Sequence, residues 1–566
     1  MMSWKRLKWL KKIGCLLLSL LLLLLCSAVF AEEAVTGLQK DVVILFTSDV
    51  HCAVDQGWGY AGLYAMKEGL SAKNHVFLVD NGDAIQGEPI GTMSKGQSII
   101  DIMNVVGYDA AIPGNHEFDF GVQNFIERAS AANFPYLSCN LNRDGKLVFP
   151  AYVMKEVDGV KIGIVGLTTP TTPSTSSPSL FMNEEGTEFM YDFMQDETGD
   201  KLYTAVQKAV DDARAEGADY VIAVAHLGNE AGSSPWTYAD VISHTSGIDA
   251  LLDGHSHDTD QVVMKNRDGR EVVRSGCGTQ FSEIGSLTIS RDGRISSKLF
   301  PWKQDISAPE LLNLQNPAAD AVHAESDELN QTLQEVVASS TADLVINDPV
   351  ARMEDGSPVR IIRNAETNLG DLCADAYLNQ AVDADIAFVA GGGIRASIEK
   401  GNVTLHEILR TLPFNDYLTV IRVTGQQILD ALEYSVHSLP GPFGGFNQVA
   451  GMTFEVDPTI PTPCVIVGSM FHHVDETMER RVRNVVVGDS PLDPGAWYRL
   501  AGADNQLLEK GNGYTMFEGA EVLVKEGKLD NQLLIDYITG PLNGVIGEEY
   551  ADPYGQGRIV VVNSAE

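Results

Sequence analysis

The chain has 566 residues, 44% of them hydrophobic and 21% charged, and carries a formal net charge of −37 at pH 7. This composition excludes a disordered or fibrous protein, and the length exceeds what one hydrophobic core usually serves. The acidic balance argues against duplex nucleic acid as a partner, because phosphate binding normally needs a basic face. An anionic substrate would need a local positive site, built from metal ions or a few arginines.

The first 31 residues have the form of a secretory signal. Basic residues between positions 5 and 12 precede a leucine-rich run over 15–26, and residues 27–31 suit signal peptidase. We expect cleavage after Ala31 and an exported mature protein, which is periplasmic, cell-wall-associated or extracellular. The alternatives are an uncleaved anchor, for which the run is short, and lipidation at Cys26, which the large preceding residue disfavours.

Five cysteines remain after cleavage, and an odd number cannot all pair. Their wide spacing fits neither a disulfide framework nor a zinc knuckle. We therefore expect free or buried thiols at Cys52, Cys139, Cys277, Cys373 and Cys464.

Apolar runs rich in Val and Ile alternate with helical patterns in the first half of the chain. The runs predict buried strands over 42–46, 76–79, 162–165, 220–224 and 248–252. Helices are predicted over 99–106, 122–132 and 202–216. This alternation indicates an α/β fold with helices covering a sheet, which places ligands beyond the carboxyl ends of strands. The Thr- and Pro-rich stretch 168–178 is expected to be a surface loop without assigned chemistry.

The pattern changes near Trp302. Residues 309–340 are polar, with apolar residues at roughly helical intervals, and predict a linker helix. A second domain is expected to begin near Asp343. Its predicted elements are a helix over 369–381, a strand over 386–389, a β-rich region over 449–499 and a last strand over 559–562. The adjacent His472 and His473 are expected to lie in a solvated loop.

Metal-binding residue types follow the predicted strands of the first half. They occur in the segments Asp49-Val50-His51, Gly82-Asp83, Gly114-Asn115-His116-Glu117, His226 and Gly254-His255-Ser256-His257. Carboxylate, amide oxygen and imidazole together suit a pair of divalent cations, and two metals can clamp the attacking and leaving oxygens of a phosphoryl transfer. The sequence therefore predicts a dinuclear metallophosphoesterase site.

Asp83 is expected to bridge the two cations, because a carboxylate can bind both while an imidazole binds one. A lone histidine such as His226 is more often an ordinary core or surface residue, so the assignment depends on the joint pattern. The predicted ligands are Asp49, His51 and His257 for one cation, and Asn115, His226 and His255 for the other. This mixture suits Mn, Zn, Fe or Co, so the identity of the metals stays open.

His116 and Asp119 are predicted to form a catalytic pair. If Asn115 ligates, His116 can face the substrate, and Asp119 can accept a hydrogen bond from its ring and fix the tautomer. The pair would then protonate or steady the leaving oxygen. The alternative is that His116 only caps the turn after the strand.

These motifs resemble those of the secreted 5′-nucleotidase and UDP-sugar hydrolase family. The first half matches at Thr47-Ser48-Asp49-Val50-His51, Asn81-Gly82-Asp83, Gly114-Asn115-His116-Glu117-Phe118-Asp119, Gly166-Leu167-Thr168-Thr169 and Gly254-His255-Ser256-His257. The second half matches at Arg363, Glu366-Thr367-Asn368-Leu369-Gly370, Gly391-Gly392-Gly393-Ile394-Arg395, Leu412-Pro413-Phe414 and Gly511-Asn512-Gly513-Tyr514. The similarity covers nearly all of the mature chain.

The resemblance implies three parts and a site between two of them. A metallophosphoesterase-type β-sandwich flanked by helices would span 40–305, a linker helix 306–342, and a mixed α/β nucleotide-binding domain 343–566. The active site would lie in the cleft between the two domains, with a domain rotation controlling access. The seven ligand candidates would hold two metals, with His116 and Asp119 as the catalytic dyad.

On the substrate side, the resemblance implies a phosphate clamp formed by Arg363 and Arg395. Arginine suits this role because its planar fork donates paired hydrogen bonds to phosphate oxygens. Gly392 and Gly393 would let the backbone approach the ligand, and Phe414 would form one face of a base-stacking pair.

Two departures concern the nucleoside. Where the family places a second stacking aromatic, residues 503–508 offer none, and Gln506 is among them. Asn512 stands where the family has Asp, which changes a ribose contact from a carboxylate to an amide. Catalysis is thus better supported than base or ribose specificity.

The function implied is an exported dimetal phosphohydrolase that releases phosphate from nucleoside monophosphates, at the 5′ position. The same site would also suit UDP-sugars, dinucleotides, 2′,3′-cyclic nucleotides or 3′-nucleotides. A catalytically inactive secreted binding protein is a rival from another class, which the complete ligand set disfavours. We expect a small nucleotide as partner and no stable membrane insertion after cleavage, and leave the oligomeric state open.

Overall fold

The computed structural model describes residues 37–183, 188–229, 233–302, 316–353, 356, 358–381, 383–525 and 527–563. The predicted signal sequence lies outside the described residues, as does the start of the predicted linker helix. Among the helices in these ranges, none is long and apolar enough to cross a membrane.

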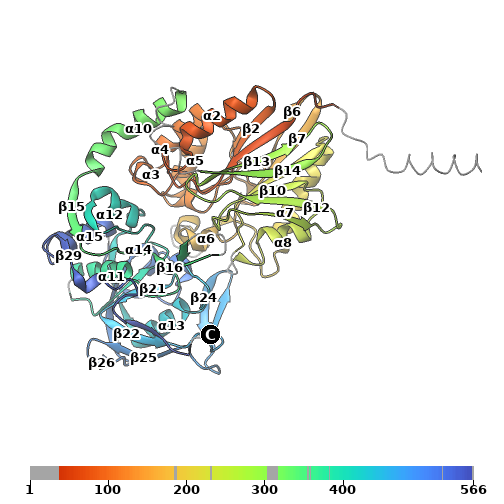
Figure 1. The fold of residues 1–566 in the computed structure, drawn as a ribbon. Coiled ribbons are helices and arrows are strands. Elements are labelled where there is room, and N and C mark those ends of the chain that lie inside the picture. Colours follow the sequence, from red (N-terminus) through yellow and green to blue (C-terminus); the bar gives the residue numbers. More distant parts are fainter. Residues whose placement is uncertain are drawn as a thin grey trace, which may run out of the picture.

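Two sheets packed face to face form the centre of the N-terminal half (Figure 1). Their strand orders are β14-β13-β1-β2-β3 and β11-β12-β10-β9-β7-β6. The strands are β1 (Val42–Thr47), β2 (His75–Asp80), β3 (Ala110–Ala111), β6 (Tyr152–Val157), β7 (Val160–Leu167), β9 (Tyr220–Ala225), β10 (Ala250–Asp253), β11 (Gln261–Lys265), β12 (Glu271–Gly276), β13 (Glu283–Ile289) and β14 (Ile295–Pro301). All five strands predicted for this half are present.

Alternating side chains of each strand explain why the sheets form a sandwich. Ile44 and Phe46 of β1 are buried with Ile222 and Val224 of β9 in one apolar cluster between the sheets. The intervening residues of β1 point the other way and pack under helices, as the two-residue period of a strand requires. The predicted β-sandwich flanked by helices is confirmed.

Helices cover both outer faces of the sandwich. The first sheet is covered by α2 (Gly59–Ser71), α4 (Gln97–Val106) and α5 (Val122–Ala131), and α10 (Pro317–Leu333) packs on α2 and α4. The second is covered by α7 (Asp200–Ala215) and α8 (Tyr238–His244). The three helices predicted here are confirmed within a few residues at their ends.

The C-terminal half centres on a mixed sheet with the order β21-β18-β27-β20-β28. One face packs on α11 (Asn368–Gln380) and α15 (Asp530–Thr539), and the other on α13 (Gly425–Ser435). The strands of this half include β15 (Val336–Ser340), β16 (Asn347–Arg352), β17 (Pro358–Arg360), β18 (Ile386–Ala390), β19 (Gly401–Thr404), β20 (Leu418–Thr424), β21 (Asn447–Ala450), β22 (Met452–Val456), β23 (Cys464–Val467), β24 (Met470–Val474), β25 (Val482–Val487), β26 (Ser490–Pro491), β27 (Trp497–Ala503), β28 (Glu521–Val524), β29 (Val545–Ile546) and β30 (Ile559–Val561).

Three local predictions were wrong. The linker helix ends at Leu333, and residues 336–340 form β15, because this Val-rich segment pairs with β19 and β29. The stretch 168–178 is largely buried and contains the short helix α6 (Thr172–Thr175), since it packs between the two halves. His472 and His473 are exposed as predicted, but they lie on strand β24.

The predicted cysteine chemistry is confirmed. Cys52, Cys139, Cys277 and Cys373 are buried free thiols, and Cys464 is a partly buried one. Cys52 directs its sulfur to the carbonyl of Ala84, away from the side chains described below.

Candidate metal centre and substrate cleft

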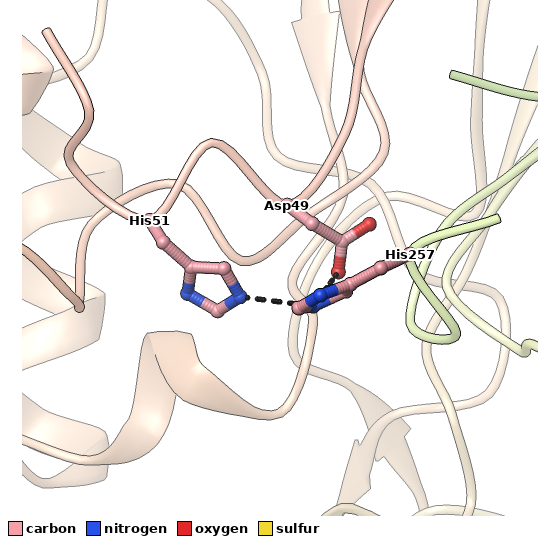
Figure 2. A group of neighbouring side chains, drawn as sticks. All are labelled: Asp49, His51 and His257. Atoms are coloured by element: carbon pink, nitrogen blue, oxygen red, sulfur yellow. Dashed lines mark hydrogen bonds and ion pairs between the residues drawn. The ribbon is translucent and has the colours of Figure 1, made fainter. Parts of the chain in front are cut away.

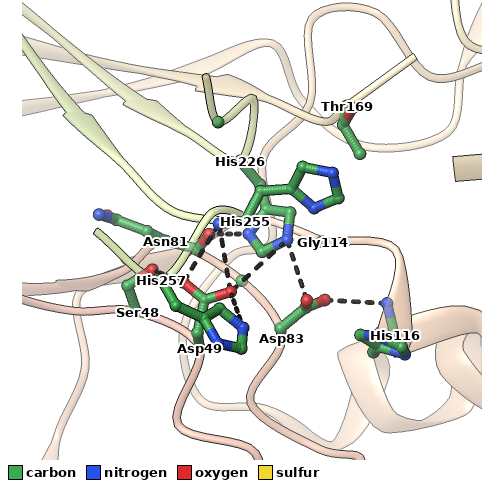
Figure 3. A network of polar contacts seen from close by, with 12 residues as sticks. Ser48, Asp49, Asn81, Asp83, Gly114, His116, Thr169, His226, His255 and His257 are labelled. Atoms are coloured by element: carbon green, nitrogen blue, oxygen red, sulfur yellow. Dashed lines mark hydrogen bonds and ion pairs between the residues drawn. The ribbon is translucent and has the colours of Figure 1, made fainter. Parts of the chain in front are cut away.

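All seven predicted metal ligands follow strand ends at one edge of the sandwich. β1, β2 and β3 run parallel to one another, and so do β9 and β10. Their carboxyl ends therefore meet at the same edge, where residues distant in sequence converge. Figure 3 shows Asp49, Asp83, His226, His255 and His257 gathered there.

The side chains form two groups that could each hold a cation. Within each group, one ligand atom per residue lies within 4.8 Å of the others. In the first group, Nε2 of His257 is 3.2 Å from Nε2 of His51 and 3.5 Å from Oδ1 of Asp49 (Figure 2). The second group comprises Asp83, His226 and His255. Nε2 of His226 lies 3.0 Å from Asp83 Oδ2 and 3.9 Å from Asp49 Oδ1, which links the two groups.

Asn115 adds an amide oxygen that lacks a hydrogen-bond partner. Its Oδ1 is buried and unpartnered, whereas Nε2 of His226 faces the carboxylate of Asp83. A buried acceptor without a partner is costly, so each such atom calls for an explanation. Metal coordination supplies one here, because amide oxygen and imidazole nitrogen are suitable ligands of divalent cations. The residues present therefore fit metal ions.

Hydrogen bonds behind the ligands orient them. Nδ1 of His51 donates to the carbonyl of Gln86 at 3.0 Å, and Nδ1 of His226 donates to the carbonyl of Asn81 at 2.7 Å. Each ring thereby presents Nε2 to the centre of the site, as in metal sites where the second ring nitrogen is hydrogen-bonded. The carboxylate of Asp49 is held by the hydroxyl of Ser48 and the backbone N–H of His255.

The backbone at these positions is unusual. Asp49, His51, Asp83, His255 and His257 all have positive φ angles, between 47° and 81°. Such conformations are uncommon outside glycine and persist where the surrounding structure imposes them, often at functional sites.

Two glycines make room for the ligands. A Cβ atom on Gly114 would collide with the carboxylate of Asp83, and one on Gly254 would collide with Ser48 and approach the Asp49 carboxylate. Both positions thus require glycine, because any side chain would displace a candidate ligand.

Burial and mutual charge set the protonation of the site. Burial lowers the pKa of His51 and of His255 to about 3, and that of His257 well below its ordinary value. All three rings are therefore neutral at pH 7, the form that binds metal. Burial alone would raise the pKa of Asp83, but the imidazoles of His226 and His116 outweigh it and hold that pKa well below its usual range.

His116 and Asp119 lie side by side, as the sequence predicts. Nδ1 of His116 is 2.6 Å from Oδ2 of Asp119, and the other oxygen of Asp119 accepts a hydrogen bond from Ser176 at 2.8 Å. Burial lowers the pKa of His116, but Asp119 and Asp83 overcome this and raise it above the ordinary value. Nε2 is left for other partners, and the ring stacks on Phe414 at 5.7 Å between centroids.

A large cleft joins the two halves at this point. Its lining includes His51, Asp83 and His116 from the N-terminal half. The predicted substrate residues of the C-terminal half line the same cleft: Arg363, Arg395, Gly392, Gly393, Phe414 and Asn512. One cavity therefore brings together the candidate metal ligands and the predicted clamp.

The two arginines predicted to form the phosphate clamp both line the cleft. Burial, and then the neighbouring Arg363, lower the pKa of Arg395 to about 10, so it stays cationic at pH 7. Its guanidinium carbon lies 5.9 Å from the ring centre of Phe414. Nε of Arg363 is buried and has no hydrogen-bond partner. An anion between these side chains would satisfy both charge and hydrogen bonding.

Comparisons with known proteins match both halves. The model of the calcineurin-like phosphoesterases matches residues 42–259, and that of the 5′-nucleotidase C-terminal domain matches residues 347–519. A snake venom 5′-nucleotidase from Gloydius brevicauda is 27% identical over 568 residues, which cover 91% of this chain and 90% of that protein. The chain belongs to the 5′-nucleotidase family.

Two further similar proteins agree with this assignment. The crystal structure of a 5′-nucleotidase precursor from Thermus thermophilus is 26% identical, has a TM-score of 0.75, and covers 93% of this chain and all of that one. The trifunctional nucleotide phosphoesterase protein YfkN of Bacillus subtilis is 29% identical over 88% of this chain, which spans only 34% of YfkN. The predicted family and fold class are confirmed, and the protein is a metal-dependent phosphoric monoester hydrolase.

Several residues of this candidate site were missed from sequence. The buried carboxylate of Glu117 accepts hydrogen bonds from the backbone N–H groups of Asp83, Ala84 and Gly114, at 2.7–2.8 Å. It thereby ties the loop after β2 to the loop after β3. The sequence signal that could have identified Glu117 is its place as the last residue of the Gly-Asn-His-Glu motif.

Arg360 and Ser176 were also missed. Arg360 lines the cleft beside Arg363 and donates to the carbonyl of Ile394 at 3.0 Å. Ser176, the partner of Asp119, belongs to the stretch to which the sequence assigned no chemistry.

Direct contacts join the halves around the cleft. Glu88 accepts from Arg410 at 2.7 Å and forms an ion pair with His406 at 3.3 Å. Thr92 donates to the carbonyl of Pro413 at 3.0 Å, beside Phe414. On another side, Ser177 donates to Glu509 at 2.6 Å. These contacts hold the clamp against the candidate metal ligands.

Proposed function

We propose that this protein is an exported 5′-nucleotidase that releases phosphate from nucleoside 5′-monophosphates at the interface of its two halves. The proposed ligands of two divalent cations are Asp49, His51, Asp83, Asn115, His226, His255 and His257. The observation that carries the proposal is the convergence, on one cleft, of these side chains with Arg363 and Arg395. A phosphate group bound there would face cations on one side and arginines on the other.

The side chains suggest a division of labour. Bound divalent cations would acidify water and neutralise charge on the phosphoryl group. Arg363 and Arg395 would hold phosphoryl oxygens through their donor forks. His116, kept in one tautomer by Asp119, would hold a proton on Nε2 for the departing oxygen, and its raised pKa suits that role.

The proposed nucleoside contacts come from the C-terminal half. Phe414 would stack on the base, Gly392 and Gly393 would approach the ligand through their backbone, and Asn512 would contact the ribose. All four line the cleft that contains the clamp.

We propose the domain limits given by the sequence: a phosphoesterase domain over 40–305, a linker over 306–342 and a substrate domain over 343–566, with β15 at the end of that linker pairing with strands of the substrate domain. Separate apolar clusters in the two halves support this division. Export, to the periplasm, the cell wall or the medium, is supported by the signal pattern that ends at Ala31.

A second candidate is hydrolysis of larger or differently linked nucleotides, namely UDP-sugars, 2′,3′-cyclic nucleotides or 3′-nucleotides. The cleft, of about 2910 Å³, exceeds the roughly 300–1,000 Å³ of common ligand pockets, so its volume admits all of them. The relative YfkN is named a trifunctional nucleotide phosphoesterase.

Product formation by the mature protein, followed by chromatography, tests both candidates. Hydrolysis of 5′-AMP or 3′-AMP releases phosphate and adenosine, whereas 2′,3′-cyclic AMP would open to a nucleoside monophosphate and UDP-glucose would give UMP and glucose 1-phosphate. The assay would supply Mn²⁺ and compare 5′-AMP, 3′-AMP, 2′,3′-cyclic AMP and UDP-glucose, with Asp83→Asn as the control for contaminating phosphatase. We expect 5′-AMP to give the highest kcat/KM. A higher kcat/KM for another substrate would replace the first candidate with the second, and no hydrolysis product from any of the four would overturn both.

A further inference from the structure

One wall of the cleft differs in chemistry from the rest. It is formed by the end of α13 with the segment that follows it, residues 434–445, and by the tip of the β23–β24 hairpin, which extends from the C-terminal half toward the N-terminal half (Figure 1). We call it the hairpin wall, and its cleft-lining residues include Tyr434, His437, Phe443, Ile466, Val467 and Ser469. None of these side chains is acidic or cationic in type except His437, whose pKa is lowered by burial. The wall therefore favours a neutral, flat group over a charged one.

Phe443 is an aromatic residue of this wall that packs against the apolar core but is not buried in it. Three residues later, Phe446 is 1% exposed and packs within the apolar core of the C-terminal half. Phe443 is only partly buried and lines the cleft. Its ring packs edge-on with those of His437 and Tyr434, at 4.5 and 5.3 Å between centroids. These neighbours fix its orientation while part of the ring stays open to the cleft.

Phe443 also lies next to the phosphate clamp. Its backbone N–H donates to the carbonyl of Arg363 at 2.9 Å. A nucleotide whose phosphate binds Arg363 would therefore have its nucleoside within reach of the hairpin wall.

The hairpin wall is held to the turn that carries Asn512. The hydroxyl of Tyr434 lies 3.2 Å from the carbonyl of Ser469 and 2.9 Å from that of Asn512. A Cβ on Gly445 would lie within 2.9 Å of both the Phe443 ring and the Cβ of Asn512, so both side chains lie next to this glycine. The proposed ribose contact and the aromatic ring thus belong to one continuous part of the cleft lining.

We propose that Phe443 is a specificity-determining residue whose ring contacts the nucleobase, with Ile466 and Val467 of the hairpin covering the edge of the bound base. The inference deepens the proposed function and rests on it. It explains how a chain without an aromatic residue over 503–508 can still offer the base a second apolar surface besides Phe414. Gln506 of that segment is buried and donates to Asn447, so it does not supply such a surface.

The test compares two esters that share a phosphate and a ribose but differ in the base: 5′-AMP and ribose 5-phosphate. Stacking on one aromatic ring is worth about a 5- to 150-fold change in affinity. Phe443→Leu should raise KM for 5′-AMP by a factor in this range and leave kcat/KM for ribose 5-phosphate within about twofold. Phe443→Tyr should retain the wild-type KM. The matched control is Trp497→Leu, which removes an aromatic that is 57% exposed outside the cleft.

The outcomes separate the inference from the function on which it rests. Equal losses for both esters in Phe443→Leu would mean that Phe443 only supports the fold, and unchanged kinetics for both would mean that it does not contact the base. Either result overturns the inference while wild-type nucleotidase activity stands. A wild-type protein that hydrolyses neither ester would instead overturn the proposed function. Direct binding of adenosine, measured by calorimetry, should weaken in Phe443→Leu even if turnover is impaired for another reason.

Discussion

The two sides of the cleft are built in different ways. On the N-terminal side, the candidate ligands are mostly buried, have positive φ angles and are crowded by glycines, so each position is fixed by several neighbours. On the C-terminal side, partly buried arginines and aromatic rings from loops face the cavity, together with aliphatic side chains of a hairpin. We therefore expect substitutions on the N-terminal side to abolish turnover, and substitutions on the C-terminal side to alter affinity and selectivity.

The largest effect is expected for Asp83→Asn. This change removes a charge from the centre of the ligand set, and several kcal/mol of transition-state stabilisation depend on metals, so turnover should fall about 10³-fold or more. Metal content should fall with it, measured by mass spectrometry of the purified protein. Asp211→Asn, on the exposed face of α7, is the matched control. A fully active wild type with one ion per chain would contradict the two-metal assignment.

A smaller loss, confined to turnover, is expected for His116→Ala. General acid catalysis contributes on the order of 10²–10⁴-fold, so kcat should fall by such a factor while the metal content stays at the wild-type level. The two quantities would be measured on the same preparation. Parallel loss of metal and activity would place His116 among the ligands and remove the proposed dyad.

Arg395→Ala should act mainly on KM. A hydrogen bond to a charged group is worth about 1.5–3 kcal/mol, which corresponds to a rise in KM of roughly 10- to 150-fold for 5′-AMP. Steady-state kinetics would check this, with Arg422→Ala, an exposed arginine of β20 outside the cleft, as the control. An unchanged KM would show that the C-terminal side does not hold the phosphate.

The smallest effect is expected for Glu88→Gln, which weakens the contact between the halves at His406 and Arg410. Because those partners are partly exposed, the pair is worth little, and KM should rise only a few-fold. Arg410→Gln should give a similar rise, and the double variant should be no worse than either single one. Additive effects would mean that the pair does not act as one contact.

Much of the N-terminal side of the cleft could be predicted from sequence. Ligands such as Asp83 and His226 follow apolar runs that become strands, and the chemistry of metal binding restricts their residue types. The roles of Glu117 and Ser176 could not be predicted in this way. Each acts through contacts with segments distant in the chain or through backbone groups, which leave no periodic pattern.

The C-terminal side of the cleft was predicted less completely. Arg363 and Arg395 came from the family resemblance, but Arg360 and the hairpin wall did not. The wall depends on Phe443 facing the cleft while Phe446 enters the core, and local sequence does not distinguish two phenylalanines three residues apart. The buried character of 168–178 was missed for a similar reason, since it depends on packing between the two halves.

The central claim is that the metal side and the arginine side meet on one phosphate group. Calorimetric titration with inorganic phosphate tests it without turnover, using metal-loaded wild type, metal-loaded Arg395→Ala and the chelator-treated wild type. We expect phosphate to bind the loaded wild type and to bind both other forms at least about tenfold more weakly. Equal affinity in all three forms, or sensitivity to the metals alone, would contradict a phosphate site shared by the two halves.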